Sequence, residues 1–130
     1  MTKYHFFAIV LAFAVLAGCG GGGFVPAGGK ITFDDGSPVT MGGIVFATGT
    51  FMAEGQIQPD GRYTLSSLKP GDGLPPGTYT VTISSEGRDA NEQPIYYVDP
   101  KFANPATSQL SVEVVKGGKN QFDFTVTKPK

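Results

Sequence analysis

The sequence predicts an all-β domain, built as an antiparallel β-sandwich of six or seven strands. Three observations point to this fold class. Apolar and polar residues alternate with a period of two in several segments, and turn-forming residues separate those segments at regular intervals. After Cys19, no segment has the 3.6-residue periodicity of an amphipathic helix. Two sheets are expected, because a single sheet with one apolar face could not bury all of these rows.

The apolar rows define the expected strands and the expected core. β-branched and aromatic side chains dominate them, and such residues fit a pleated surface with one buried face. The rows are Ile31/Phe33, Ile44/Phe46, Tyr63/Leu65, Tyr79/Val81/Ile83, Leu110/Val112/Val114 and Phe122/Phe124/Val126. In the last row, Phe122 and Phe124 should lie on the same face and at the centre of the core.

Clusters of Gly, Pro and Asp punctuate these rows. Glycine permits positive φ angles and proline fixes its own φ, so the clusters predict tight turns. They occupy residues 34–38, 59–61, 69–73, 75–77 and 116–118. Residues 86–108 break the strand rhythm, since they are polar and contain three prolines. We expect a long loop there, with a short extended piece around residues 95–98.

The N-terminal segment has the pattern of a secretory signal. Lys3 precedes twelve mostly apolar residues, 6–17, which is too short for a bilayer-spanning helix of about 20 residues. Leu16, Ala17 and Gly18 then lead directly to Cys19. This stretch resembles the lipobox of bacterial lipoproteins.

That resemblance implies cleavage of residues 1–18 as a signal peptide and lipidation of Cys19. The modified cysteine would carry a diacylglycerol and an amide-linked acyl chain such as palmitate, which together anchor a protein stably to a membrane. The expected location is the cell envelope, and Gly20 after the cysteine favours an outer membrane or cell surface. Residues 19–28 are Gly-rich and predict a flexible tether, followed by one domain at residues 29–130.

The composition of the remaining chain argues against catalysis and nucleic-acid binding. Removing 18 residues from 130 leaves 112, enough for one small domain. Lys3 is lost with the signal, so nine basic residues face eleven acidic ones, a formal charge of −2. His5, the one histidine of the chain, is lost too, and lipidation would leave no free thiol. We expect no enzyme activity and no cofactor or metal.

Three stretches together resemble the carboxypeptidase regulatory-like, or transthyretin-like, domains, especially those of small bacterial lipoproteins. They are GKITF leading to DGSPV at residues 29–39, PDGRYTL at 59–65 and PGTYTVTI at 76–83. The resemblance implies an immunoglobulin-like or prealbumin-like β-sandwich without catalytic residues. Gln109 departs from the pattern, because the similar proteins usually have glycine there. Its side chain disfavours a positive-φ turn before Leu110.

Candidate binding residues lie in the 86–108 segment. Tyr96, Tyr97 and Phe102 offer aromatic surfaces of the kind used to bind proteins or sugars, although they could instead plug one end of the core. Asp34 and Asp35 could hold a hard cation, but ordinary turn chemistry accounts for them better. The sequence therefore predicts a non-catalytic binding or structural module for another envelope protein. The alternative is a module that binds carbohydrate or an ion.

Overall fold

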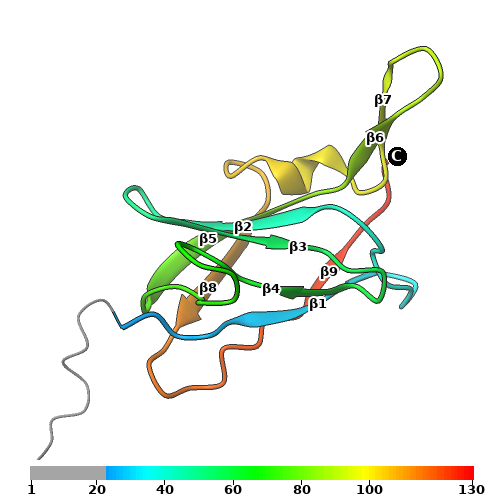
Figure 1. Ribbon diagram of the computed structural model, residues 1–130. Helices are drawn as coiled ribbons and strands as arrows, with labels where there is room; N and C mark the ends of the chain where they lie inside the picture. The colour runs from blue at the N-terminus through cyan, green and yellow to red at the C-terminus, as the bar shows by residue number, and fades with distance from the viewer. Residues whose placement is uncertain (1–22) are drawn as a thin grey trace, which may run out of the picture.

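The computed structural model describes residues 23–130, which form nine β-strands and one short 3-10 helix (Figure 1). The elements are β1 Gly28–Phe33, β2 Gly43–Ala47, β3 Met52–Gln56, β4 Arg62–Thr64, β5 Gly77–Ser84, β6 Glu86–Arg88, β7 Pro94–Tyr96, η1 Pro100–Ala103, β8 Leu110–Val114 and β9 Phe124–Val126. The predicted all-β class is confirmed.

Seven of the strands make a two-layered sandwich. One sheet has the order β3-β2-β5-β8 and the other has the order β4-β1-β9. The pairs are antiparallel except β1 with β9, which run parallel with Ile31 opposite Phe124. The expected six or seven sandwich strands are therefore confirmed. The parallel β1–β9 pair differs from the prediction, which was for antiparallel strands. Strands β6 and β7 form a separate two-stranded hairpin.

The inward faces of the two sheets form one hydrophobic core, as the period-two rows predict. On β5, Tyr79, Val81 and Ile83 are buried, whereas Thr78 and Thr80 are exposed. The other fully enclosed side chains come from β1, β2, β8 and β9 and from the segments between strands, and they include Ile31, Val39, Ile44, Phe46, Leu65, Leu74, Val98, Val114 and Val126. Alternation along each strand thus determines which side chain enters the core.

Phe46 on β2 is the centre of an aromatic cluster in this core. Its ring lies 5.8–6.4 Å, centroid to centroid, from the rings of Tyr63, Tyr79, Phe122 and Phe124. Phe122 and Phe124 are half-buried, while Phe46 is fully enclosed. The expectation that Phe122 and Phe124 lie on one face agrees with their shared contact with Phe46. Their expected place at the centre of the core is wrong, because β9 is an edge strand of the smaller sheet.

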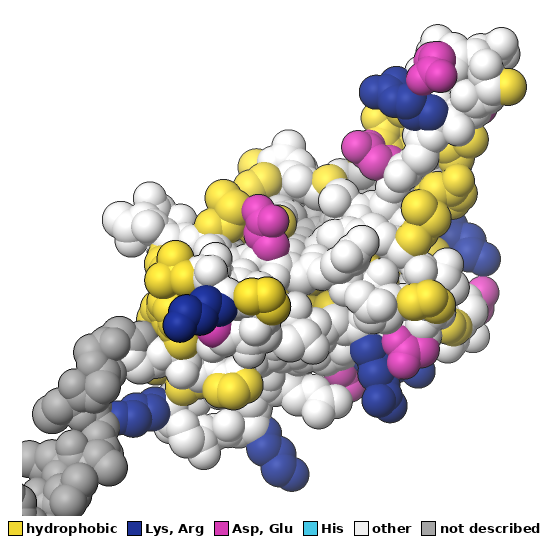
Figure 2. All heavy atoms as spheres, in the orientation of Figure 1, with side chains coloured by type: hydrophobic (Ala, Val, Ile, Leu, Met, Phe, Trp, Pro, Cys, Tyr) yellow, Lys and Arg dark blue, Asp and Glu magenta, His cyan; other side chains and the backbone are white. Residues whose placement is uncertain are grey.

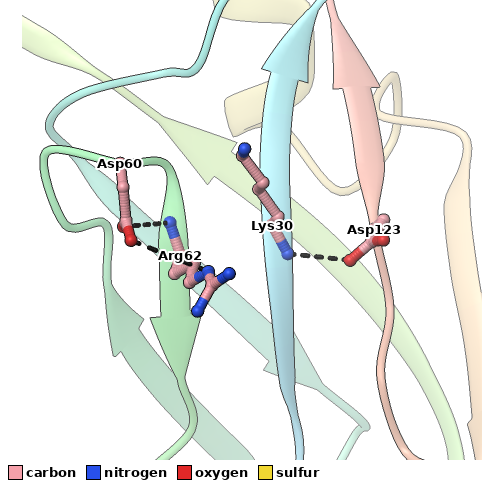
Figure 3. A network of polar contacts seen from close by, with 4 residues as sticks. All are labelled: Lys30, Asp60, Arg62 and Asp123. Atoms are coloured by element: carbon pink, nitrogen blue, oxygen red, sulfur yellow. Dashed lines mark hydrogen bonds and ion pairs between the residues drawn. The ribbon is translucent and has the colours of Figure 1, made fainter.

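Exposed polar contacts accompany the strands of the smaller sheet (Figure 3). The backbone N–H of Lys30 on β1 donates to the Asp123 carboxylate before β9, at 2.9 Å. On the neighbouring strand, Arg62 pairs with Asp60 at 3.6 Å and its backbone N–H donates to the same carboxylate. All of these side chains are exposed, so their contribution to stability is small.

The domain begins earlier than the sequence predicts. Val25 exchanges two backbone hydrogen bonds with Leu74, and Ala27 is buried. The Phe24 ring packs 5.8 Å from the ring of Phe51. Residues 24–28 of the predicted tether therefore belong to the folded domain, because these larger side chains find apolar partners on it.

Residues 86–108 are not one long loop. Strands β6 and β7 pair from Glu86 with Tyr96 to Arg88 with Pro94, and η1 follows. The hairpin turn has no glycine. Instead, the Asp89 carboxylate accepts the N–H groups of Asn91 and Gln93, and Glu92 adopts a φ of 62°. We call residues 86–96 the arm, since Figure 1 shows them projecting from the sandwich.

Gln109 also departs from the expectation drawn from its side chain. Its φ is 55°, within the left-handed region that favours glycine, so the predicted avoidance of a positive-φ turn is wrong. The neighbouring Ser108 is buried, and its N–H donates to the Asn104 carbonyl at 2.8 Å. Ser108 is held on one side and Leu110 pairs with Val81 on the other. These two constraints hold the backbone of position 109 at positive φ.

Candidate binding site at the base of the arm

The arm continues the chain of β5 past the end of the sandwich. β5 ends at Ser84 and β6 begins at Glu86, so Ser85 lies at the junction. The Ser85 carbonyl accepts the backbone N–H of Tyr97 at 2.8 Å. Two residues further on, the Asp99 N–H donates to the Thr127 carbonyl at 2.9 Å. These bonds fix the base of the arm to the sandwich.

Two of the three predicted binding aromatics lie at this base and are accessible. The exposed fractions of Tyr96 and Tyr97 are 43% and 42%, and that of Ile95 is 37%. Figure 2 shows hydrophobic side chains along the arm down to the sandwich, with charged side chains at its tip. The prediction for Phe102 is wrong. It is only 7% exposed, because η1 turns its ring into the core beside β5.

Gly87 explains how the Tyr97 ring lies on the arm. A Cβ atom at position 87 would lie 3.2 Å from Tyr97 Oη and 3.3 Å from the ring. The absence of a side chain therefore lets the ring lie against β6. Covering a strand glycine with an aromatic ring is a known way to stabilise exposed β-structure.

A groove of about 460 Å³ opens beside the two tyrosines. We call it the arm groove. Five short stretches of the chain line it: Phe33, residues 39–41, Ser85, residues 96–97 and residues 128–129. The walls are mainly apolar, and Met41 is one of the few large apolar side chains that stay exposed. Its size lies within the range of ligand-binding clefts.

Lys128 places a positive charge at the rim of the arm groove. Its Nζ lies 5.2 Å from the centre of the Phe33 ring and 3.6 Å from the Asp35 carboxylate. The pKa of Asp35 is lowered, mainly because the carboxylate accepts hydrogen bonds from the Ser37 hydroxyl and backbone N–H, and Lys128 lowers it further. Asp35 is thus firmly ionised, and its main partners are those of an ordinary turn.

Ser85 is one of the residues that line the arm groove, but its hydroxyl oxygen is itself buried. The residue is 3% exposed, and its hydroxyl has no hydrogen-bond partner among residues 23–130. The sequence did contain a signal for it. Position 85 continues the buried row of Tyr79, Val81 and Ile83 with the same period of two, so a serine there faces inward. No sequence pattern indicated Met41 or Lys128.

The other candidate residues do not converge on a site. Within the described part of the chain, no three metal-ligating side chains come together. Asp35 uses its carboxylate to close a local turn. Leu16, Ala17, Gly18 and Cys19, the predicted processing and lipidation site, lie outside the described residues.

The comparisons with known proteins leave the family resemblance a prediction. The one helix in residues 23–130, η1, lacks the length and hydrophobicity needed to span a membrane. No family model, curated protein or solved structure matches the chain.

Proposed function

We propose that this chain is a lipid-anchored bacterial envelope protein that binds another envelope protein without catalysis, using the arm and its base as the contact surface. The observation that carries the proposal is the placement of the arm. In Figure 1, the described chain starts at one end of the sandwich and the arm projects from the other. An anchor at the first end would direct the arm away from the membrane.

Anchoring through Cys19 rests on the lipobox-like sequence. Gly23, the first described residue, comes four residues after Cys19, and four residues span at most about 14 Å. A lipidated Cys19 would therefore hold this end of the sandwich close to the membrane surface. The resemblance to transthyretin-like lipoproteins supports the same location, in the outer membrane or at the cell surface.

The arm has the properties of a surface that a partner covers. A two-stranded hairpin alone in water is marginally stable, and this one exposes Ile95 and Tyr96, with the exposed Tyr97 directly after it. Tyrosines give a large contact area at low cost in side-chain entropy, which is why they are common in binding surfaces. Charged residues at the tip keep the free arm soluble.

An edge strand is the less favourable docking surface. Of the described strands, β8 pairs only with β5, so one of its sides could accept a partner strand. However, β8 is five residues long and exposes Glu113, and a charge on an edge strand discourages pairing with another chain. The arm exposes more large apolar side chains than β8 does, and it lies beside the arm groove.

Carbohydrate binding is the second candidate function. Tyr96 and Tyr97 both line the arm groove together with the hydroxyl-bearing Thr40. Aromatic rings beside hydrogen-bonding groups are typical of sugar-binding sites. This candidate predicts that an envelope glycan, rather than a protein, is retained by the arm.

Replacing Cys19 with alanine should abolish acylation. The cells should accumulate an unprocessed precursor that does not incorporate a radiolabelled fatty acid, because the lipid is expected on the Cys19 sulfur. Labelling and electrophoretic mobility measure both effects. Normal labelling of the Cys19→Ala protein would refute the proposed anchor.

Site-specific photo-crosslinking in cells tests the proposed contact surface. A photoreactive amino acid at Tyr96 should give a discrete adduct with an envelope protein, identified by mass spectrometry. The same group at Ser111 reports on the edge of β8, and Thr64 on the smaller sheet serves as the control. Adducts at Ser111 but not at Tyr96 would move the interface to the edge strand, and a glycan adduct at Tyr96 would favour the second candidate.

A further inference from the structure

Three loops build the end of the sandwich where the described chain starts, opposite the arm (Figure 1). They follow β2, β4 and β8, and we call them together the proximal end: residues 48–51, 65–76 and 115–120. Each loop contacts the start of the chain. The Phe24 ring packs on Phe51. Val25 is hydrogen-bonded to Leu74, and the Gly28 N–H donates to the Asn120 carbonyl at 3.1 Å.

The second loop holds a leucine out into the solvent. The side chain of Leu68 is 78% exposed, more than any other large apolar side chain in residues 23–130. The loop around it is well ordered by hydrogen bonds, since the Asp72 carboxylate accepts the backbone N–H groups of Ser67, Leu68 and Lys69 at 2.7–3.0 Å. A single exposed leucine is common on protein surfaces, so this one gains meaning only from the charges around it.

The proximal end is positively charged although the whole molecule is acidic. Lys69, Lys116 and Lys119 are all exposed there. The one acidic residue of the three loops, Asp72, directs its carboxylate onto the backbone N–H groups of its own loop. Of the nine basic and eleven acidic residues after Cys19, these loops hold three and one, which leaves six and ten elsewhere. Figure 2 shows Lys or Arg side chains among hydrophobic ones at this end.

A membrane is the partner that the position of the proximal end selects. Cys19 lies four residues before Gly23, and four residues reach at most about 14 Å. A second folded domain, about 30 Å across, does not fit into that gap. Anionic headgroups attract lysines over a Debye length of about 8–10 Å, so an anchored domain is drawn the remaining distance onto the bilayer.

We propose that the proximal end docks on the bilayer that holds the lipid anchor. Leu68 inserts among the headgroups, and Lys69, Lys116 and Lys119 pair with the phosphates of anionic phospholipids. This inference rests on the proposed function, because the lipid on Cys19 brings this end to the membrane. It adds that the domain stands in one orientation, with the arm held at the far side from the bilayer.

A single tryptophan tests the contact of Leu68 with lipid. The chain contains no tryptophan, so Leu68→Trp gives an unambiguous fluorescence reporter, and Tyr96→Trp on the arm is the matched control. Each lipidated full chain is reconstituted into vesicles of phosphatidylcholine and phosphatidylglycerol in equal parts, with bromine on the acyl chains. The bromine should quench the Leu68→Trp chain by about half or more and leave the Tyr96→Trp chain unquenched, because a docked residue reaches about 5–10 Å into the headgroup region. Any result other than stronger quenching at position 68 would overturn the inference.

Replacing the lysines tests the charge. In the Leu68→Trp chain, the triple change Lys69→Gln, Lys116→Gln and Lys119→Gln should lower the quenching to the level seen in vesicles of phosphatidylcholine alone. The control triple change is Lys101→Gln, Lys128→Gln and Lys130→Gln, which removes the same charge outside the three loops and should leave the quenching unchanged. All six lysines are exposed, so neither triple change should alter the melting temperature. Equal effects of the two triple changes, or no effect of the first, would overturn the role of the proximal lysines.

The inference and the proposed function fail separately. Acylation of Cys19 without quenching at position 68 would leave the anchor standing and remove the docking surface. Quenching at position 68 in a full chain whose Cys19 carries no acyl group would establish the docking surface and remove the proposed anchor.

Discussion

Phe46→Ala is expected to lower the free energy of unfolding by about 3–5 kcal/mol, the typical cost of truncating a buried phenylalanine. Phe46 is fully enclosed and contacts four aromatic rings, three of which belong to the opposite sheet or to the segment that leads into it. The cavity would open between the two sheets, where the backbone cannot easily collapse. Small domains have only about 5–15 kcal/mol in total, so this variant should be close to unfolding at physiological temperature.

Urea unfolding followed by circular dichroism measures this loss. Phe122→Ala should cost less than Phe46→Ala, because Phe122 is half-buried, and Thr125→Ala on the exposed face of β9 should cost least. This order distinguishes the aromatic cluster from a general loss of apolar surface. Equal losses at Phe46 and Phe122 would show that Phe46 is not the centre of the core.

Gly29→Ala is expected to destabilise the domain by about 3 kcal/mol, at the upper end of the usual range for overpacking. A Cβ atom at position 29 would lie 1.9 Å from the Phe122 carbonyl oxygen, which is impossible without moving one of the two backbones. The Phe122 N–H also donates to the Gly28 carbonyl at 2.8 Å. The substitution would therefore push the segment before β9 away from β1.

Gly49→Ala is the matched control. It also adds one methyl group to a glycine, but no atom lies within 4 Å of that position and its φ is not positive. Thermal unfolding should separate the two variants by well over five degrees in a domain of this size. Similar melting temperatures would show that the approach of Phe122 to Gly29 is not a tight constraint.

The local pattern of the sequence determined most of the strands and the direction of their side chains. Tyr79, Val81 and Ile83 are buried while Thr78 and Thr80 are exposed, as alternation requires. The turn at residues 34–37 follows from Asp35 and Gly36 by the same local chemistry, in which a short polar side chain bonds its own backbone. These properties depend on neighbours within a few residues, so they can be deduced from the chain itself.

The details of the arm depended on contacts that local rules do not contain. The turn of the arm holds Glu92 at positive φ, and Gln109 adopts the same region, although neither is glycine. Local preference opposes both conformations by about 1–2 kcal/mol, and the surrounding hydrogen bonds outweigh it. For the same reason, a polar segment rich in proline became a hairpin and a 3-10 helix instead of a loop.

The sequence alone determined the all-β class, most of the strand segments and the inward-facing rows, because each of these follows from short-range pattern. Only the tertiary structure decided that Phe46 is the centre of the core, that Phe102 faces inward while Tyr96 and Tyr97 stay accessible, and that Lys128 meets Phe33. Lys128 and Phe33 are 95 positions apart in the chain. Such residues come together only when the sheets pack. The free energy of that packing comes from all the core contacts together, so the sequence of one segment does not reveal it.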